Sequence, residues 1–121
     1  MIIYVSRTGN VKSIVEKLDL PNSEIQDGLV VHSPYFLFTY TDGLGEIPDK
    51  VNDFLSIKEN QKYIKGVIVS GNINFGEMFC EAGIQISTKF NVPLIRKIDL
   101  RGTNEDLIVI KNQYTNYIEG E

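Results

Sequence analysis

The stretch "YVSRTGNVKSIVEKL", residues 4–18, joins a predicted strand to a predicted helix with almost no spacer. The strand is the apolar run "IIYV" at residues 2–5, which is typical of a strand buried on both faces of a parallel sheet. The helix is indicated by apolar residues at helical spacing, Val11, Ile14, Val15 and Leu18. Pro21 follows three residues later and predicts that the helix has ended there.

Four further apolar runs alternate with turn-rich or helical stretches along the chain. They cover residues 29–32, 35–40, 65–70 and 92–98. Strands that alternate with helices predict an α/β fold, a parallel sheet with helices on both faces, because right-handed crossovers place them there. Five strands favour a small doubly wound sheet of three layers. The connection between the second and third runs, "VHSPY", is too short for a crossover helix, which weakens the case for the second strand.

Three more helices are expected after the later strands. Helical spacing is found in two apolar sets, Ile47, Val51, Phe54 and Leu55, with Pro48 in the first turn, and Phe79, Ala82, Gly83, Ile86 and Phe90. In "RGTNEDL", Thr103 and Asp106 have the spacing of a capping box and predict a third helix. Its sheet-facing residues would be Leu107, Ile110, Tyr114 and Tyr117. A strand at residues 107–110 is the alternative, since that run is strongly β-prone.

Size and composition restrict the class of protein. A chain of 121 residues with 42% apolar and 23% charged residues fits one folded domain, residues 1–121. The net charge is −4, and the Lys and Arg residues are scattered, so no nucleic-acid partner is expected. We find neither a signal peptide nor an apolar run of about 18 residues, so no membrane association is expected. The single cysteine, Cys80, fits a reducing, cytoplasmic location.

The segment "SRTGN" is a candidate phosphate site, because ligands of open α/β sheets bind at the carboxyl ends of the strands. Ser6 and Thr8 offer hydroxyls, Gly9 offers flexibility, Asn10 offers an amide, and the helix start offers free N–H groups. We expect the Arg7 side chain to point to solvent. The spacing excludes both a nucleoside-triphosphate loop and a dinucleotide fingerprint, which leaves a monophosphate site. The alternative is a tight turn with an ordinary helix cap.

Two other segments follow strands and would lie beside this loop. They are "TYTDGLGEIPD", residues 39–49, and "SGNINFGEMF", residues 70–79. Each combines glycines with aromatic or amide side chains, among them Tyr40, Asn72, Asn74 and Phe75. A flat ring with polar edges would fit between the two segments. A phosphate and a planar heteroaromatic ring together describe flavin mononucleotide, FMN.

The motifs also resemble a known family. "SRTGN" matches the flavodoxin phosphate-loop pattern, and flavodoxin is a doubly wound protein that binds FMN at its switch point. Together with "FLFTYTDGLGEIPD", "SGNINFGEMFCEAG" and "LRGTNEDL", it resembles the NrdI family, the small flavodoxin-like partners of class Ib ribonucleotide reductase. The resemblance covers nearly the whole chain and implies the strand order 2-1-3-4-5. Val11 departs from the pattern, because flavodoxins usually have a hydroxyl residue there.

The resemblance implies a redox role for bound FMN. NrdI proteins accept electrons, here from an electron-donating reductase, and when reduced they react with molecular oxygen to give a superoxide-like oxidant. The oxidant passes to the dimanganese small subunit of the reductase and helps to generate its tyrosyl radical. Such a protein is an activator of ribonucleotide reductase rather than a stand-alone metabolic enzyme. The flavin carries out the chemistry, so no catalytic side chain and no metal ligand are expected.

Three segments are expected to contact the cofactor. The phosphate loop comprises Ser6, Arg7, Thr8, Gly9, Asn10 and Val11. The ring would be bordered by Tyr40, Thr41, Asp42, Gly43, Leu44 and Gly45, and its pyrimidine side or the partner-facing rim by Ser70, Gly71, Asn72, Asn74, Phe75, Gly76 and Glu77. We also expect a glycine peptide, at Gly43 or Gly45, to turn its carbonyl towards the protonated N5 of the reduced flavin. This hydrogen bond would stabilise the reduced states selectively.

Two rival functions use the same fold. A general flavodoxin electron carrier would pass single electrons to soluble reductases without involving oxygen. A cofactor-free signalling domain, similar to a response-regulator receiver, would need acidic residues at the strand ends, where this chain has Ser6 and Arg7. The remaining conspicuous residues are expected to be structural or solvated: Cys80 in the core, His32 partly exposed, and Asp42, Glu46 and Asp49 on an acidic rim.

Overall fold

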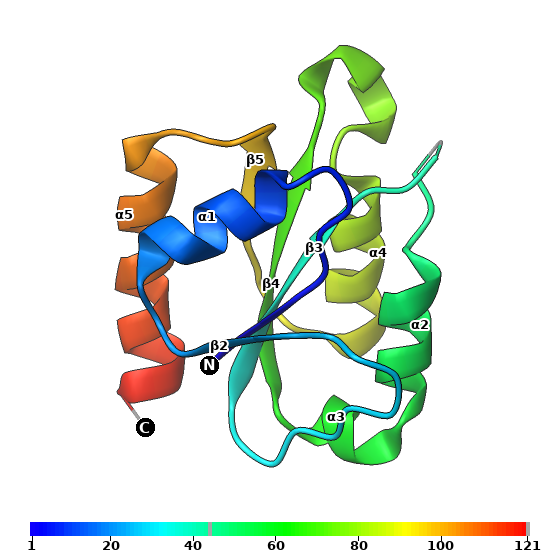
Figure 1. Ribbon diagram of the computed structural model, residues 1–121, viewed down its shortest axis with the longest axis vertical. Coiled ribbons are helices and arrows are strands. Elements are labelled where there is room, and N and C mark those ends of the chain that lie inside the picture. The colour runs from blue at the N-terminus through cyan, green and yellow to red at the C-terminus, as the bar shows by residue number, and fades with distance from the viewer. Residues whose placement is uncertain (44, 121) are drawn as a thin grey trace.

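A five-stranded parallel sheet runs through the middle of the molecule (Figure 1). The computed structural model describes residues 1–43 and 45–120. Within these residues the strands are β1 (Ile2–Tyr4), β2 (Asn22–Glu24), β3 (Tyr35–Tyr40), β4 (Ile64–Gly71) and β5 (Leu94–Asp99). They pair in the order β2-β1-β3-β4-β5, and every pair is parallel. The predicted doubly wound, flavodoxin-like sheet is therefore confirmed.

Helices cover both faces of the sheet, which gives the three predicted layers (Figure 1). On one face lie α1 (Asn10–Leu18) and α5 (Asn104–Tyr114), and on the other lie α2 (Asp49–Ser56) and α4 (Glu81–Phe90). The short helix α3 (Lys58–Lys62) precedes β4, the 3-10 segment η1 (Ile73–Met78) follows β4, and the π-helical turn η2 (Thr115–Glu119) extends α5. Segment η1 projects beyond the carboxyl ends of the strands at the top of Figure 1.

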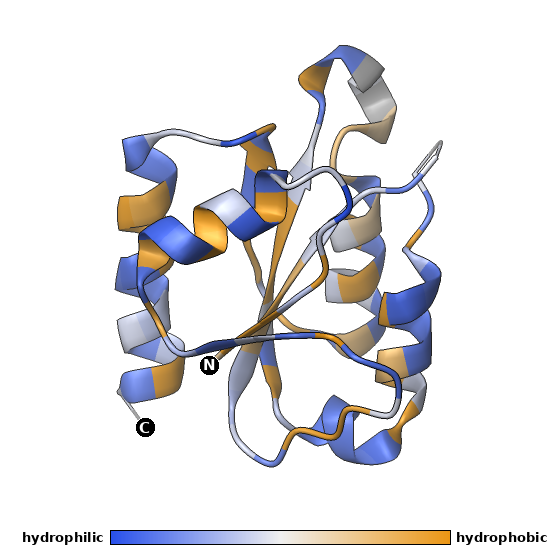
Figure 2. Ribbon diagram, viewed as in Figure 1, coloured by the Kyte–Doolittle hydropathy of each residue, from blue (hydrophilic) through white to orange (hydrophobic). Residues whose placement is uncertain are grey.

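Alternation along the central strand β3 builds a separate core on each face of the sheet. Phe36 and Phe38 pack with the apolar residues of α1 and α5, whereas Tyr35 and Leu37 pack with those of α2 and α4. All four are completely buried, as a strand covered on both faces requires. Figure 2 shows the apolar colour along the strands and on the helix surfaces that face them.

The predicted second strand, residues 29–32, was wrong. Strand β2 is the polar segment Asn22–Glu24, which pairs only with β1 at the edge of the sheet. An edge strand is half solvated, so its sequence lacks the apolar run that marks the central strands. The segment between β2 and β3 contains no helix, and Ile25 and Val31 cover the α2–α4 side of the sheet there.

Buried Asn60 replaces strand pairing for this segment. Its side-chain oxygen accepts a hydrogen bond from the Val31 N–H at 2.7 Å. Its amide nitrogen donates to the carbonyls of Leu29 and Phe54, each at 2.9 Å. Backbone groups of residues 29–31 are thus paired without a ladder, which is why an apolar run is buried here without being a strand.

Most helix predictions hold with small shifts at the ends. Helix α1 covers the predicted apolar face, and the last element is the helix α5 rather than a strand. Thr103 caps α5 with the predicted capping box, and Tyr117, although 40% exposed, packs its ring edge-on against buried Phe36 of β3, with ring centroids 6.3 Å apart. Pro48 is the N-cap of α2 rather than part of its first turn. In α4, Gly83 allows close approach to the sheet, since a Cβ there would come within 2.5 Å of Val69.

Candidate functional site

The carboxyl ends of β1, β3, β4 and β5 border one cleft of about 310 Å³. Its lining is Ser6, Arg7, Thr8, Asn10, Val11, Tyr40, Thr41, Ser70, Gly71, Asn72 and Leu100. Ten of these eleven residues are predicted cofactor contacts, and the eleventh is Leu100. The topology therefore brings together three segments that are distributed over residues 6 to 72 of the sequence.

The phosphate loop, residues 6–11, enters helix α1 directly. Gly9 is the N-cap of α1 with φ of +93°, a left-handed conformation that favours glycine. The N-cap residue itself, Gly9, has no side chain to cap the helix start. The Lys12 N–H donates to Ser6 Oγ at 3.3 Å, whereas the earlier N–H groups of the first turn have no helical acceptor available. These N–H groups, the hydroxyl of Thr8 and the helix dipole form a site suited to a phosphate.

The hydroxyl of Thr41 indicates whether the cleft fits a polar ligand. Its Oγ1 is buried and has no hydrogen-bond partner in the part of the chain that the structure describes. A buried hydroxyl without a partner costs roughly 1–3 kcal/mol, so such groups are rare in folded proteins. Thr41 lines the cleft, and a ligand with polar ring edges would supply the missing partner. The cleft residues therefore fit a flavin.

The Arg7 side chain is exposed, as predicted, but it also contacts Asp42 and Tyr40. Its guanidinium donates to Asp42 Oδ1 at 2.5 Å and lies 5.0 Å from the centre of the Tyr40 ring. The side chain thus connects the phosphate loop with the loop that follows β3, residues 41–46. The pKa of the Tyr40 hydroxyl is raised by burial and by the charge of Asp42, while Arg7 acts in the opposite direction. Both ends of the ion pair are partly exposed, so its energy is modest.

The far end of the loop of residues 41–46 is attached to α4. The Gly45 carbonyl accepts a hydrogen bond from Gln85 Nε2 at 3.1 Å, and a Cβ on Gly45 would come within 3.1 Å of Met78. Gly45 lines a separate open groove with Glu46 and Glu81 rather than the cleft. Gly43 is exposed, and its N–H donates to Asp42 Oδ1 at 3.0 Å. Leu44, a predicted ring contact, lies outside the described residues.

Among the described residues of the third segment, only those at its beginning line the cleft. Ser70, Gly71 and Asn72 do so, whereas Asn74 and Gly76 are exposed in η1. The side chain of Asn72 accepts a hydrogen bond from the Asn74 N–H at 2.9 Å. The side chains of Phe75 and Glu77, also predicted contacts, lie outside what the structure describes.

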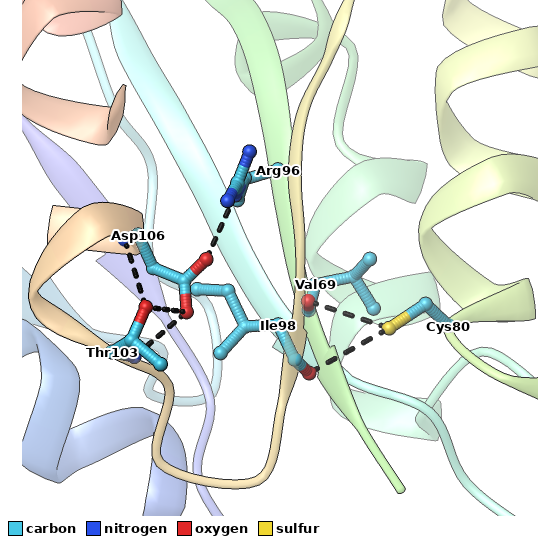
Figure 3. A network of polar contacts seen from close by, with 6 residues as sticks. All are labelled: Val69, Cys80, Arg96, Ile98, Thr103 and Asp106. Atoms are coloured by element: carbon cyan, nitrogen blue, oxygen red, sulfur yellow. Dashed lines mark hydrogen bonds and ion pairs between the residues drawn. The ribbon is translucent and has the colours of Figure 1, made fainter. Parts of the chain in front are cut away.

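Leu100 was missed because it lies after β5, where we expected only a helix cap. Residues 99–102 form a turn, closed by a hydrogen bond from the Gly102 N–H to the Asp99 carbonyl at 2.9 Å. Asp106 fixes the next residues: it accepts hydrogen bonds from Arg96 and from the Thr103 N–H, each at 2.8 Å (Figure 3). The motif "LRGTNED", which begins with Leu100, was the sequence feature that could have indicated this residue.

The other conspicuous residues do not join the cleft. Cys80 is completely buried, as predicted, and its Sγ faces the carbonyls of Val69 and Ile98 (Figure 3). His32 is largely exposed and pairs with Glu59 at 3.2 Å. In residues 1–43 and 45–120 we find no cluster of His, Cys, Asp and Glu side chains that could hold a metal ion. None of the described helices is long and apolar enough to cross a membrane.

Comparison with known proteins now adds to this geometry. Residues 2–112 match the family described as "NrdI Flavodoxin like". The chain belongs to the NrdI family. This membership confirms the predicted family and implies a flavin cofactor, in agreement with the fit of the cleft.

The fold of this NrdI-family protein is also similar to a solved flavodoxin structure. That structure is a short-chain flavodoxin associated with a non-canonical PDU bacterial microcompartment. The two chains align with a TM-score of 0.67 and 21% sequence identity over 98% of this chain and 95% of the other. At this identity the similarity supports the fold alone.

Proposed function

We propose that this NrdI-family protein binds FMN in the cleft and acts as a redox activator of class Ib ribonucleotide reductase. The proposal depends on the presence in one cleft of two features, a phosphate loop at the end of β1 and, at the end of β3, the buried hydroxyl of Thr41, which has no partner among the described residues. In this proposal the loop binds the phosphate of FMN, and Thr41 binds a polar edge of its ring.

The chain's own residues have distinct tasks in this proposal. The first-turn N–H groups of α1 and the Thr8 hydroxyl bind the phosphate. Thr41 hydrogen-bonds the polar ring edge, and Tyr40 covers the ring while Arg7 holds Tyr40 and Asp42 in position. The ion pair with Arg7 also neutralises the carboxylate of Asp42, one member of the acidic rim. The rim therefore disfavours negative charge on a bound flavin less than three unpaired carboxylates would.

Bound FMN would supply one-electron transfer, including transfer to molecular oxygen to give a superoxide-type oxidant. The electrons would come from an electron-donating reductase, and the oxidant would serve the dimanganese small subunit in forming its tyrosyl radical. Membership in the NrdI family supports ribonucleotide reductase as the partner.

The binding half of the proposal is tested by titrating the protein with FMN and with riboflavin, which lacks the phosphate. We expect FMN to bind at least about tenfold more tightly, and we expect the Thr8→Ala variant to lose much of that preference while binding riboflavin normally. Equal affinity for the two flavins would contradict the phosphate site. A chain that binds neither flavin would favour the cofactor-free, receiver-like reading.

The activation half needs a separate experiment. Reduced protein should consume oxygen and should raise the radical yield of a manganese-loaded small subunit above that obtained with free FMN. If the reduced protein fails to react with oxygen and leaves the radical yield unchanged, the protein is instead a general flavodoxin electron carrier.

A further inference from the structure

We propose that Leu100 is a cofactor-contact residue, whose side chain supplies the apolar contact on the β5 side of the cleft. The inference rests on the proposed flavin function and adds a residue outside the three predicted segments. It is argued from the backbone conformation of Leu100, from the hydrogen bonds that hold it, and from the chemistry of the cleft around it.

The backbone conformation of Leu100 is unusual for a leucine. Its φ is +52°, in the left-handed region that costs a side-chain-bearing residue energy. Among the described residues the other non-glycine cases are Asp19, Cys80 and Asn91. Asp19 and Asn91 are of the two types that tolerate this region and form C-caps, and Cys80 is completely buried at the start of α4. Neither explanation applies to Leu100, because leucine does not tolerate this region well and the residue is 45% exposed.

The structure holds Leu100 in this conformation from the cleft side. Its N–H donates to the Gly71 carbonyl at 2.7 Å, and its carbonyl accepts a hydrogen bond from Ser70 Oγ at 2.7 Å. Ser70 and Gly71 both line the cleft themselves. The Leu100 backbone is therefore held by the same two residues that form the β4 side of the site.

The following residues fix the turn from the other side. Thr103 and Asp106 close the capping box of α5, and Arg96 of β5 donates to the same carboxylate at 2.8 Å (Figure 3). A turn needing a left-handed residue ordinarily uses Gly, Asn or Asp. Placing an exposed leucine there, between two sets of hydrogen bonds, favours a role for the side chain itself.

The chemistry of the cleft gives that role. Most of its side chains are polar, and its other aliphatic residue, Val11, is only 1% exposed and packs in the core. Leu100 is thus the aliphatic lining residue with substantial exposed surface. A flavin has an apolar ring surface and a carbon chain that need such a contact, whereas its phosphate does not.

Titrations with FMN and riboflavin test the proposal with the variants Leu100→Ala, Leu100→Asn and Leu100→Gly. Because the contact is apolar, each variant should weaken the binding of both flavins by the same factor, about five- to tenfold, or about 1.0–1.4 kcal/mol. The unfolding midpoint of the flavin-free Leu100→Gly variant should be at least as high as that of the wild type, because glycine relieves the left-handed strain. Lower affinity with undiminished stability is a result that a purely structural role would not give.

Two control variants test whether a loss of flavin affinity could come from relieving any left-handed residue or from shortening any exposed aliphatic side chain. Asp19→Gly relieves a left-handed residue outside the cleft, and Ile108→Ala shortens an aliphatic residue that is 60% exposed on α5. Both should bind FMN and riboflavin as the wild type does. Wild-type affinity in all three Leu100 variants, or a Leu100→Gly variant that loses several degrees in midpoint, would overturn the inference while wild-type FMN binding still supported the proposed function. If the wild type bound neither flavin, the function and the inference would fail together.

Discussion

Two threonines on either side of Tyr40 have opposite hydrogen-bonding states. Thr39 Oγ1 is completely buried and donates to the Tyr40 carbonyl at 2.8 Å. Thr41 Oγ1 is buried without a partner among the described residues. Because folding alone should select against the second arrangement, Thr41 is better explained by ligand binding than by stability.

Thr41→Val should therefore raise the stability of the flavin-free protein, by up to about 1 kcal/mol, while lowering FMN affinity about five- to twentyfold. The matched variant Thr39→Val should instead lower stability by about 0.5–1.5 kcal/mol. Urea unfolding of both variants and an FMN titration check these effects. Similar destabilisation by the two substitutions would show that Thr41 has a structural role.

Cys80 is a second residue whose surroundings decide its chemistry. Burial raises the pKa of its thiol to about 11, so almost no thiolate exists at neutral pH. We expect a thiol reagent to label Cys80 only as fast as the protein opens at pH 8, and to label it rapidly in urea. Rapid stoichiometric labelling of the native protein would contradict the buried placement.

At the scale of elements, the start of α5 depends on one carboxylate. Burial by itself would raise the pKa of Asp106, but hydrogen bonds from Arg96 and Thr103 outweigh it and leave the pKa below its ordinary value. A carboxyl whose pKa is lowered by folding adds stability above its unfolded pKa, near 3.8, and that stability is lost as the pH falls through the folded pKa.

Asp106→Asn should thus destabilise the protein by about 1–3 kcal/mol at pH 7, and the difference from the wild type should shrink below about pH 4. Urea unfolding at several pH values measures this. Glu105→Gln, an exposed neighbour in the same helical turn, should have an effect within about 0.5 kcal/mol at every pH. A destabilisation by Asp106→Asn that stayed constant down to pH 2 would argue against the charge as its cause.

The segment between β2 and β3 depends in the same way on Asn60. Asn60→Ala removes three hydrogen bonds to the backbone, those with Val31, Leu29 and Phe54, and should cost about 2–4 kcal/mol, although the Phe54 carbonyl keeps a second hydrogen bond from the Ile57 N–H at 3.4 Å. Asn52→Ala removes one long, exposed hydrogen bond of 3.4 Å to the Ile47 carbonyl and should change stability by less than about 0.5 kcal/mol. Equal unfolding midpoints for the two variants would show that Asn60 does not organise this segment.

At the scale of the whole molecule, the cleft joins the ends of four strands that belong to both core layers. A ligand held by all four can bind only the folded chain. FMN at 100 times its dissociation constant should then stabilise the protein by about 2.7 kcal/mol and raise the thermal midpoint by roughly 10 °C. Riboflavin at the same concentration should raise it less, and an unchanged midpoint with FMN would contradict binding in this cleft.

The sequence by itself determined the features that depend on neighbouring residues. The alternation of central strands and helices, the phosphate-loop turn into α1 and the capping box of α5 each depend on residues at most a few positions apart. Local propensity and periodicity are enough to specify such features, and the family motifs follow the same local stretches.

Only the tertiary structure decided the features that depend on contacts between segments far apart in the sequence. Strand β2 is identified by its pairing with β1 and not by its own polar residues, and residues 29–31 are ordered by Asn60, about 30 positions away. The Arg7 side chain reaches Asp42, and Leu100 enters the cleft through Ser70 and Gly71. The physical reason is that pairing, burial and side-chain contact are properties of two segments brought together by folding, and neither segment carries a local pattern that specifies its partner.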